Sequence, residues 1–384
     1  MAPSQDRSVL PLSVNPAAGP TPYLDLDLGI ALDQFNALRA ALPETAVHYA
    51  VKADPDPRLL GALHAACSRF DVASPAEVQA ALTAGARPED LVYSNPVKRR
   101  EDVRTAYDVG VRLFVVDSPE ETAKVAVAAP GAEILVRLVT SGEGSDWPLS
   151  RKYGCSTGEC VEVLRAAHDL GLDPAGVAFH VGSQQRDPAA WRAPIVAAAR
   201  VFEAARASGL APRILDLGGG FPALHEGHHP SFTKYGKVID RALTEAFGTK
   251  RPATLVEPGR GIVGDAGTLV ASVVGVLRRG GVRWVFLDAG VYTGLVETLD
   301  EAIRYRLVTS ADGGPTGPAV LAGPTCDSAD VLYEHNPVQL PLDLAEGDTV
   351  RLLSAGAYTT CYSTVGFNGF APLRTRYAEG LVPA

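Results

Sequence analysis

A lysine stands where a buried strand is expected to end, in the stretch HYAVKADPD (48–56). Residues 46–51 are apolar enough for such a strand, and Pro55 and Pro57 interrupt whatever follows Lys52. A lysine at this place is most often a surface residue whose stem lies along apolar atoms. A desolvated lysine can instead form a Schiff base with a carbonyl group. The types of residue at the neighbouring strand ends can distinguish these two interpretations.

Polar residues also stand near the ends of several other predicted strands. In a parallel barrel these ends meet at one face, which is where such folds carry their chemistry. Each residue alone has an ordinary structural explanation, as a helix cap, a core histidine or one partner of an ion pair. The residues brought to this face are Asp71, Arg137, His180 and Glu257.

Two glycine-rich loops, GGGFP (218–222) and EPGRG (257–261), follow the seventh and eighth predicted strands. Glycines let backbone N–H groups approach an anion closely, and Arg260 adds a fixed positive charge. Loops after these two strands often form the phosphate site of a barrel. A glycine run or an arginine alone is a weak signal, but the two together in these loops favour a phosphate site.

Glu257 stands beside this predicted phosphate site and has two interpretations. It could pair with Arg260, or it could face the ring nitrogen of a pyridinium cofactor and keep that nitrogen protonated. His180 could stack on such a ring, and Ser183 could donate to the phosphate. A lysine for a Schiff base, a phosphate cradle and a carboxylate for a pyridine nitrogen together indicate a pyridoxal phosphate site.

These residues need a scaffold that brings distant strand ends together. From about residue 46 to 260, short apolar runs alternate with amphipathic helical segments, which is typical of a parallel sheet. Eight such units favour a (β/α)8 barrel, with a doubly wound sheet as the structural alternative. The predicted strands are 46–51, 70–74, 91–95, 113–117, 134–139, 176–181, 214–219 and 254–259, and the predicted helices include 75–85, 119–129, 157–171 and 189–209.

After about residue 265 the pattern changes to short alternating runs without long helices between them. This change predicts a second, mostly antiparallel β domain of the sandwich or barrel type. Its predicted strands lie within 268–278, 283–290, 319–324 and 348–358. The start of the chain also resembles strand and turn, so we expect a barrel at 27–265 and a β domain formed by 1–26 and 266–384.

The composition limits the class of protein and its partners. A chain of 384 residues with 21% charged residues is typical of a two-domain globular protein, and its net charge of −9 argues against nucleic acid. No apolar run approaches the roughly 20 residues of a membrane helix, and no signal-peptide core is visible. Five scattered cysteines without a CxxC pair favour reduced thiols in a cytoplasm. The histidines of HEGHHP (225–230) are expected to form a polar loop, so no metal site is predicted.

Seven separated motifs resemble those of the fold-type III pyridoxal phosphate decarboxylases, in the family's order and across nearly the whole chain. The similarity is greatest to bacterial ornithine/lysine decarboxylases. It implies an eight-stranded α/β barrel with a β domain, in agreement with the pattern of runs. The motifs are YAVKA (49–53), FDVASPAE (70–77), FHVGSQ (179–184), LDLGGGFP (215–222), EPGR (257–260), GPTCDSAD (323–330) and GAYTTCYSTVGFNGF (356–370).

The resemblance implies that the cofactor is pyridoxal 5'-phosphate and gives each matching residue a role. Lys52 would carry the cofactor as a Schiff base, His180 would stack on its ring, and Glu257 would pair its pyridine nitrogen. The glycine loops, with a serine, an arginine and a tyrosine, would hold the phosphate. The residues expected to bind the cofactor are Lys52, Asp71, Arg137, His180, Ser183, Gly218, Gly219, Gly220, Glu257, Gly259, Arg260 and Tyr358.

The resemblance also implies residues that act on the substrate. Cys326 would protonate Cα after carbon dioxide has left, and Asp327 would bind a distal amino group. In the family these two residues come from the partner subunit, which implies a homodimer with shared active sites. Tyr292, Asp300 and Glu301 are further substrate-binding candidates, although a solvated helix face explains the two acidic residues equally well.

The expected reaction is the decarboxylation of a basic L-amino acid, ornithine or lysine, to putrescine or cadaverine and carbon dioxide. The motif GPTCDSAD favours a substrate with a distal cation, because Asp327 needs a partner of opposite charge. The alternatives are a diaminopimelate decarboxylase, a decarboxylase of a related diamino acid or conjugated intermediate in siderophore or antibiotic biosynthesis, an amino acid racemase, and an inactive homologue that only binds. The loop at 141–154 is a hypothetical mobile segment over the site.

Overall fold

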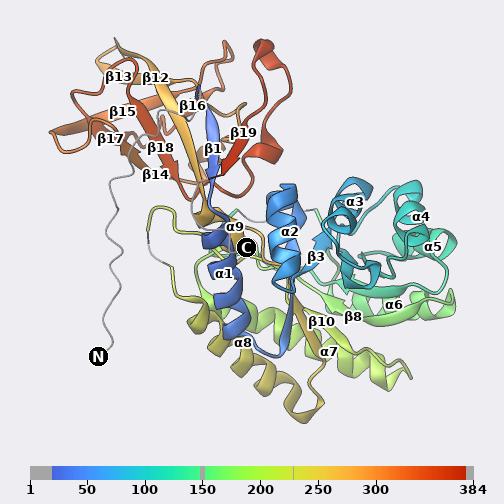
Figure 1. Ribbon diagram of the computed structural model, residues 1–384. Helices are drawn as coiled ribbons and strands as arrows, with labels where there is room; N and C mark the ends of the chain where they lie inside the picture. The colour runs from blue at the N-terminus through green and yellow to red at the C-terminus, as the bar shows by residue number, and fades with distance from the viewer. Residues whose placement is uncertain (1–19, 148–151, 228, 378–384) are drawn as a thin grey trace.

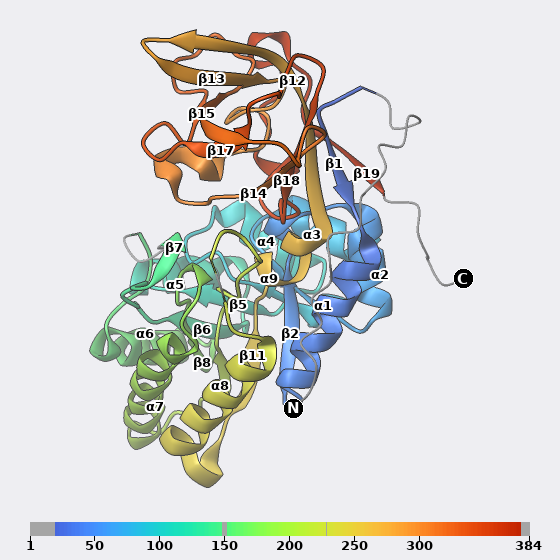
Figure 2. The ribbon, with the colours of Figure 1, turned by 90° about the vertical axis from the view of Figure 1, so that its left-hand side faces the viewer.

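The structure is a computed structural model that describes residues 20–147, 152–227 and 229–377. It consists of a barrel with a β domain seated over one end of it (Figures 1 and 2). Residues 1–19 and 378–384 of the predicted β domain, residues 148–151 of the loop at 141–154, and residue 228 of the histidine loop lie outside the described residues.

Eight parallel strands close into the predicted barrel, in the order β10-β11-β2-β3-β4-β5-β6-β8. Their order around the barrel follows their order along the chain, as short right-handed crossovers require. The strands are β2 (Thr45–Ala50), β3 (Arg69–Val72), β4 (Leu91–Tyr93), β5 (Leu113–Val116), β6 (Glu133–Arg137), β8 (Asp173–Ala178), β10 (Ile214–Asp216) and β11 (Ala253–Val256).

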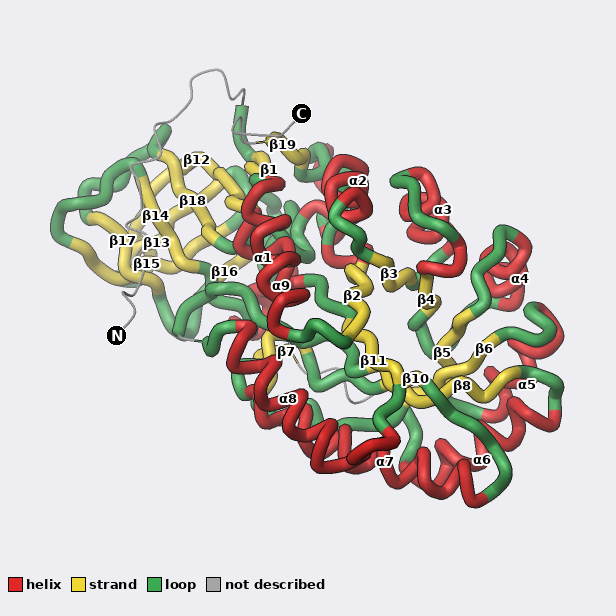
Figure 3. Tube along the Cα trace, turned by 60° about the horizontal axis from the view of Figure 1, so that its bottom comes forward, coloured by secondary structure: helices red, strands yellow, loops and turns green. Residues whose placement is uncertain are grey.

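Helices surround this ring of strands on the outside (Figure 3). Three of them begin with a side-chain cap followed directly by proline, which suits the first helical position because it lacks an N–H. Asp56, Ser74 and Ser118 each accept from backbone N–H groups of the following turn. The helices are α1 (Leu28–Ala41), α2 (Pro57–Ala65), α3 (Pro75–Thr83), α4 (Arg100–Asp108), α5 (Pro119–Ala128), α6 (Thr157–Asp169), α7 (Arg192–Ala207), α8 (Phe232–Phe247) and α9 (Arg260–Val263).

Alternation along β2 sorts its side chains between the two faces of the barrel wall. Val47 and Tyr49 are buried in the core between strands and helices. Ala46 and His48 point instead into the barrel and line a cavity there. The same strand therefore supplies the outer core and the interior of the barrel, and it delivers Lys52 at its carboxyl end.

The β domain is a nine-stranded curled sheet in which most pairs are antiparallel. It is mixed rather than uniform, because β1 pairs with β19, and β13 with β15, in parallel. The first described strand, β1, also pairs with β12, so a strand that precedes the barrel in the sequence joins a sheet formed by strands that follow it. Its strands are β1 (Tyr23–Leu26), β12 (Gly267–Arg279), β13 (Val282–Leu287), β14 (Arg306–Thr309), β15 (Thr316–Ala322), β16 (Val331–Leu332), β17 (Val338–Pro341), β18 (Thr349–Leu353) and β19 (Arg374–Tyr377).

The barrel strands are shorter at their carboxyl ends than the sequence predicts. The strand expected at 254–259 ends at Val256, and the one expected at 214–219 ends at Asp216. Glycine and proline follow at both places, and neither favours continuation of a strand. As a result Glu257 and the glycines of 218–220 lie in loops, where their backbone is free to face a ligand.

A segment of the β domain packs directly onto the carboxyl ends of the barrel strands. The backbone N–H of Tyr358 donates to the carbonyl of Ala53 at 2.7 Å, which fixes the segment beside Lys52. A small antiparallel pair, β7 (Ser145–Trp147) with β9 (Ser183–Gln185), stands at the same end. Over the described ranges, no helix combines the length and the apolar character that crossing a membrane requires.

Candidate active site

A cavity of about 690 Å³ lies where the β domain meets the carboxyl ends of the strands. It brings together side chains from residues far apart in the sequence, including six that sequence analysis singled out. Those six are Lys52, Arg137, His180, Ser183, Glu257 and Tyr358. Phosphate-sized and ring-sized ligands both fit within such a volume.

Lys52 lies in a short 3-10 turn, η2 (Val51–Ala53), immediately after β2. Its Nζ donates to Asp71 Oδ2, and Ser94 Oγ donates to the other oxygen of the same carboxylate. Burial lowers the pKa of Lys52, but the charges of Asp71 and Glu257 outweigh burial and hold the pKa above its ordinary value. The amine is therefore held as a cation on a fixed carboxylate, inside the cavity.

Glu257 is a buried carboxyl group, and its Oε1 has no hydrogen-bond partner among the described residues. Burial, followed by the charges of Asp216 and Asp71, raises the pKa of Glu257 well above its ordinary value. Burial also raises the pKa of Asp216, whose Oδ1 accepts from the N–H of Gly218 at 2.8 Å. A cationic N–H donor placed at Oε1 would favour the ionised form of Glu257.

His180 presents a neutral ring to the cavity. Burial, followed by the charges of Arg137 and Lys52, lowers its pKa well below the ordinary value. The N–H of Gly182 donates to its Nδ1 at 3.0 Å, which leaves the ring proton on Nε2. A neutral, fixed, flat ring is suited to stacking on another flat ring.

The loop Gly218–Gly220 has room for backbone but not for side chains. A Cβ at Gly219 would lie 2.6 Å from the carbonyl oxygen of Glu257 and 3.0 Å from Nε2 of His180. Gly218 and Gly220 also have positive φ angles of 66° and 109°, which favour glycine. Gly259 is equally confined, because a Cβ there would lie 2.7 Å from Ala53 Cβ.

Arg260 is a buried guanidinium at this glycine cradle. Its Nε donates to Ser183 Oγ at 3.2 Å, and its Nη2 donates to Glu297 Oε1 at 2.6 Å. The guanidinium lies 4.9 Å from the centroid of the Tyr358 ring. Burial lowers the pKa of Arg260, but the charge of Glu297 raises it more, so that the group stays cationic.

These residues fit pyridoxal phosphate, as three observations show. An amine on a buried carboxylate can hold an aldehyde carbon, and the orphaned Oε1 of Glu257 can accept from a pyridinium nitrogen. A cradle that admits only glycine backbone lies beside a fixed guanidinium, as a phosphate group needs.

The predicted substrate-binding residues and the predicted proton donor lie away from this cavity. Cys326 is exposed on the β domain, where its backbone N–H donates to Asn368 Oδ1 at 3.0 Å. Asp327 is exposed beside it and accepts from the N–H of Ala329. Burial, and the neighbouring Asp327, raise the pKa of Tyr292. The structure thus brings Cys326, Asp327 and Tyr292 to one region, but none of them lines the Lys52 cavity of its own chain.

The structure does not bring Asp300 or Glu301 to the cavity either. Glu301 accepts from the backbone N–H groups of His335 and Asn336 and pairs with Arg304, so its carboxylate holds a loop. Asp300 is exposed and has a φ of 52°. Glu297, three residues before Asp300, is the acidic residue of this segment that lines the cavity.

Sequence reasoning missed several residues of the site. Ser94 follows β4 directly, so the rule that found Lys52 and Glu257 at strand ends could have found it. Asp216 is the last residue of β10, so the same rule could have found it. Trp147 lies in the loop expected over the site and Tyr362 in the last of the seven motifs, but neither residue was singled out, and no sequence signal indicated Glu297. All three reach the cavity through the packing of loops and the β domain.

Comparison with known proteins identifies a family whose model matches this chain. The family described as "Pyridoxal-dependent decarboxylase, pyridoxal binding domain" matches residues 29–264. The lysine/ornithine decarboxylase of Selenomonas ruminantium is 36% identical over 354 residues, which cover 91% of this chain and 88% of the relative.

Solved structures agree with the sequence comparison. A lysine decarboxylase structure from Selenomonas ruminantium matches with a TM-score of 0.86 and 35% identity, over 94% of both chains. The lysine/ornithine decarboxylase of Vibrio vulnificus complexed with putrescine matches with a TM-score of 0.84 and 34% identity, again over 94% of both chains. Its complex with cadaverine matches with a TM-score of 0.85 and 35% identity, over 94% of this chain and 95% of the other.

Proposed function

The chain belongs to the pyridoxal-dependent decarboxylases, and we propose that its substrate is a basic L-amino acid, ornithine or lysine. The products are then putrescine or cadaverine and carbon dioxide. The observation that carries this substrate class is Asp327, an exposed carboxylate directly after Cys326 that can pair with a distal ammonium group. The net charge of −9 also favours cationic ligands, and the similar Vibrio vulnificus enzyme was solved with putrescine and with cadaverine.

Pyridoxal 5'-phosphate is the cofactor, and the proposed cavity residues would hold it at three places. Lys52 would hold its aldehyde carbon through Nζ, and Glu257 would hold the pyridine nitrogen through Oε1. Arg260 and Ser183 would bind the phosphate together with the backbone of the glycine loop and Tyr358. When bound, the cofactor supplies the electron sink that accepts the electron pair of the bond to the departing carboxylate.

The chain's own groups position the substrate and move its protons. The neutral ring of His180 provides a flat surface that fixes the plane of the ring opposite it. Asp71 holds the Lys52 amine in place through a charge-assisted hydrogen bond. Cys326 is proposed to deliver a proton from Sγ to Cα after carbon dioxide has left, and Asp327 to hold the distal ammonium of the substrate.

Cys326 and Asp327 are proposed to act in the cavity of a second copy of this chain. Both are exposed and neither lines the Lys52 cavity of its own chain. Large apolar side chains are exposed around Asn368, which accepts from Cys326, among them Phe367, Phe370 and Val365, whose exposed fraction is 86%. A patch of this kind is typical of a surface that another protein covers, and supports a homodimer with two shared active sites.

The five cysteines are all free thiols. Free cysteines, three of them exposed, are compatible with a reducing compartment. We therefore propose that the protein works in the cytoplasm.

A substrate panel tests the proposed function. The enzyme loaded with pyridoxal phosphate is given L-ornithine, L-lysine, L-arginine or meso-diaminopimelate, and carbon dioxide and amine are measured by mass spectrometry. We expect ornithine or lysine to be turned over with kcat/KM of about 10⁴ M⁻¹s⁻¹ or more. The variant Asp327→Asn should lose about 100-fold in kcat/KM for these two, because a buried ammonium loses its charge partner.

The outcome of the panel separates the proposed substrate from its alternatives. Faster turnover of diaminopimelate than of ornithine and lysine would contradict the role of Asp327. Slow turnover of all four by an enzyme that binds its cofactor normally would leave a related diamino acid or a conjugated biosynthetic intermediate as the substrate.

A further inference from the structure

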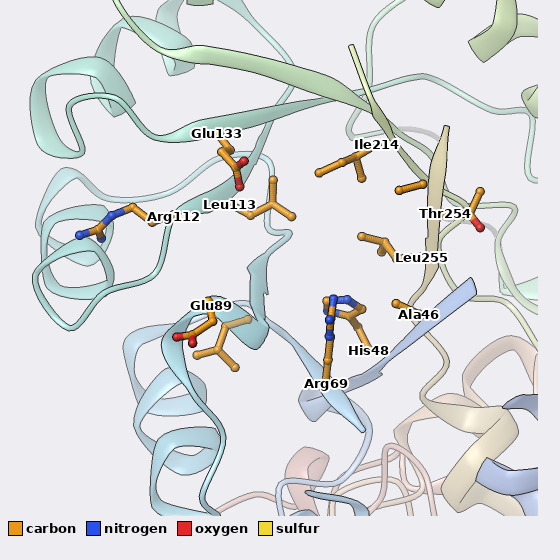
Figure 4. Close-up of a pocket in the computed structure, with 12 residues that line it drawn as sticks. Ala46, His48, Arg69, Glu89, Arg112, Leu113, Glu133, Ile214, Thr254 and Leu255 are labelled. Carbon is orange, nitrogen blue, oxygen red and sulfur yellow. The ribbon is translucent and has the colours of Figure 1, made fainter. Parts of the chain in front are cut away.

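A second cavity lies inside the barrel at the opposite end from Lys52. It has a volume of about 260 Å³ and is lined by residues at the amino ends of the strands (Figure 4). His48 stands in its wall on β2, the strand that leads into the turn carrying Lys52. The two cavities share no lining residue, so they are separate.

The ring of His48 is the most unusual feature of this lower cavity. Its exposed fraction is 3%, and in the part of the chain that the structure describes no group meets either ring nitrogen with good hydrogen-bond geometry. Burial, followed by the charge of Arg69, lowers the pKa of His48 to about 4. A buried polar group left unpaired is costly, so a neutral imidazole aimed into a cavity requires a partner there.

Arg69 stands next to His48 across the sheet, because the two residues are register partners in the β2–β3 pair. It is half exposed at the mouth of the cavity. Among the described residues its ion-pair partner is Asp90, whose Oδ1 lies 3.4 Å from Nε, which leaves the ends of the guanidinium for another acceptor. His48 and Arg69 therefore form a pair of donors, one buried and one at the mouth (Figure 4).

The other charged residues of the lower cavity have partners of their own. Glu133 accepts from Arg213, and Glu89 lies 3.3 Å from Arg87. Arg112 donates to two backbone carbonyl groups, those of Tyr107 and Val111. Arg69 is the charged residue of this wall that is the register partner of His48, so it is placed to bind an anion together with the imidazole ring.

The rest of the wall is aliphatic. Leu113, Ile214 and Leu255 surround the space beside His48 (Figure 4), and Leu91 also lines the cavity. One water occupies about 30 Å³ in the liquid, so the cavity is several times larger than a single water needs. An apolar wall with one cluster of donors is complementary to a ligand with an anionic head and a short hydrocarbon tail.

We propose that the lower end of the barrel is a binding site for a short-chain aliphatic monocarboxylate, held by Arg69 and His48. The carboxylate accepts from the guanidinium of Arg69 and from the N–H of His48, and the tail lies against the leucine and isoleucine side chains. The neighbouring carboxylates of Glu89 and Glu133 disfavour a ligand of higher negative charge. The site rests on β2, which leads into the turn that holds Lys52, and on β3, which carries Asp71.

Butyrate is the probe that tests this site, with butylammonium and n-butanol as controls of equal length. The full-length enzyme, loaded with pyridoxal phosphate and labelled with ¹⁵N in histidine, is titrated while the imidazole signals are followed by NMR. The His48 signal is assigned from its absence in His48→Phe. We expect butyrate, and neither control, to shift this signal saturably.

Arg69→Gln is the decisive variant, because its side chain lies at the mouth and its replacement leaves the barrel interior intact. It should weaken butyrate binding by about tenfold or more, as the loss of a charged hydrogen bond implies. Arg99→Gln is the control, since Arg99 also forms an exposed ion pair with an aspartate, Asp102, and neither of these two residues lines the cavity. This control should bind butyrate within about twofold of the unaltered enzyme, because surface pairs contribute little.

Three results would overturn the proposal. Butyrate could leave the His48 signal unmoved, it could bind Arg69→Gln as tightly as the unaltered enzyme, or butylammonium could produce the same shift. A crystal structure with butyrate provides an independent readout that does not depend on a variant. Electron density for water alone between His48 and Arg69 would also rule the site out.

Discussion

The neighbours of Lys52 determine the protonation state of its amine. Burial alone would lower the pKa of Lys52, but the charges of Asp71 and Glu257 raise it above its ordinary value and hold the ammonium form. Asp71 in turn is held by Ser94, so the charge that retains the proton is itself fixed. Capture of an aldehyde requires the neutral amine. The resting site therefore holds the Lys52 amine in a fixed position but in its unreactive, protonated form.

The variant Asp71→Asn tests this balance. Without the carboxylate, burial should lower the pKa of Lys52, and the neutral fraction at pH 7 should rise. Below the pKa each pH unit changes that fraction about tenfold, so cofactor-free Asp71→Asn should capture pyridoxal phosphate about tenfold faster or more at pH 7. Its capture rate should also reach a plateau at lower pH than that of the unaltered enzyme.

Stopped-flow absorbance of the bound cofactor measures this rate across pH. Ser94→Ala is the control, because it removes a donor to Asp71 and leaves the negative charge in place. Capture by Asp71→Asn that is slower at every pH, or unchanged in its pH profile, would contradict the assigned cause of the raised pKa.

Glu297 gives a second prediction, because it forms a buried ion pair with Arg260. Removing one partner of such a pair costs about 3–5 kcal/mol when the other charge stays buried. In Glu297→Gln the Arg260 guanidinium can still donate to the amide oxygen of the new glutamine. It has no counter-charge, however, until the phosphate of the cofactor binds. The cofactor-free variant should therefore lose more stability than the loaded one, and by linkage it should bind pyridoxal phosphate more tightly.

Thermal unfolding with and without the cofactor, together with the cofactor Kd, tests the role of Glu297. Glu301→Gln is a matched control in the same segment, because Glu301 holds a loop away from the cavity. Weaker cofactor binding by Glu297→Gln than by the unaltered enzyme would show that Glu297 positions Arg260 instead of competing for its charge.

At the scale of elements, the parallel strands determine where the chemistry is found. Apolar runs separated by helical segments were sufficient to predict eight strands, and the strand ends led to Lys52, His180 and Glu257. The sequence could not define where each strand stops, because strand length depends on pairing with neighbours as well as on composition. Glycine and proline after β10 and β11 end those strands early and turn their continuations into the cofactor loops.

The loop after β10 gives a prediction at this scale. In Gly219→Ala the new Cβ would meet the carbonyl of Glu257 at 2.6 Å, so the loop must shift. Such overpacking costs about 1–3 kcal/mol, and we expect cofactor affinity to fall about tenfold or more. Calorimetric titration of the cofactor-free protein measures the change.

Gly61→Ala is the matched control for this loop. Gly61 lies inside α2 with nothing within 4 Å of an added Cβ, so alanine should stabilise the protein by about 0.5–1 kcal/mol. It should leave cofactor binding unchanged. Unchanged cofactor binding in Gly219→Ala as well would show that the glycine cradle does not require its close backbone contacts.

At the scale of the whole molecule, the barrel supplies the cofactor cavity and the β domain closes it. Tyr358 and Glu297 come from outside the eight barrel units, yet both line the cavity beside Lys52. Contacts between domains leave no periodic pattern in a sequence, which is why Glu297 was missed and Glu301 was considered in its place. The role of Cys326 came from resemblance, since its own chain places it away from the cavity.

The most direct test of this account is the formation of amine by mixed subunits. Lys52→Ala lacks the cofactor-holding amine, and Cys326→Ala lacks the proposed proton donor, so each alone should form almost no putrescine from L-ornithine or cadaverine from L-lysine. If each site combines Lys52 of one copy with Cys326 of the other, a dimer with one subunit of each variant has one intact site and one inactive site. When equal amounts of the two variants exchange subunits, half of the dimers are of this kind. The exchanged mixture should then recover about a quarter of the unaltered activity. Activity no greater than the sum of the two variants would contradict the shared site.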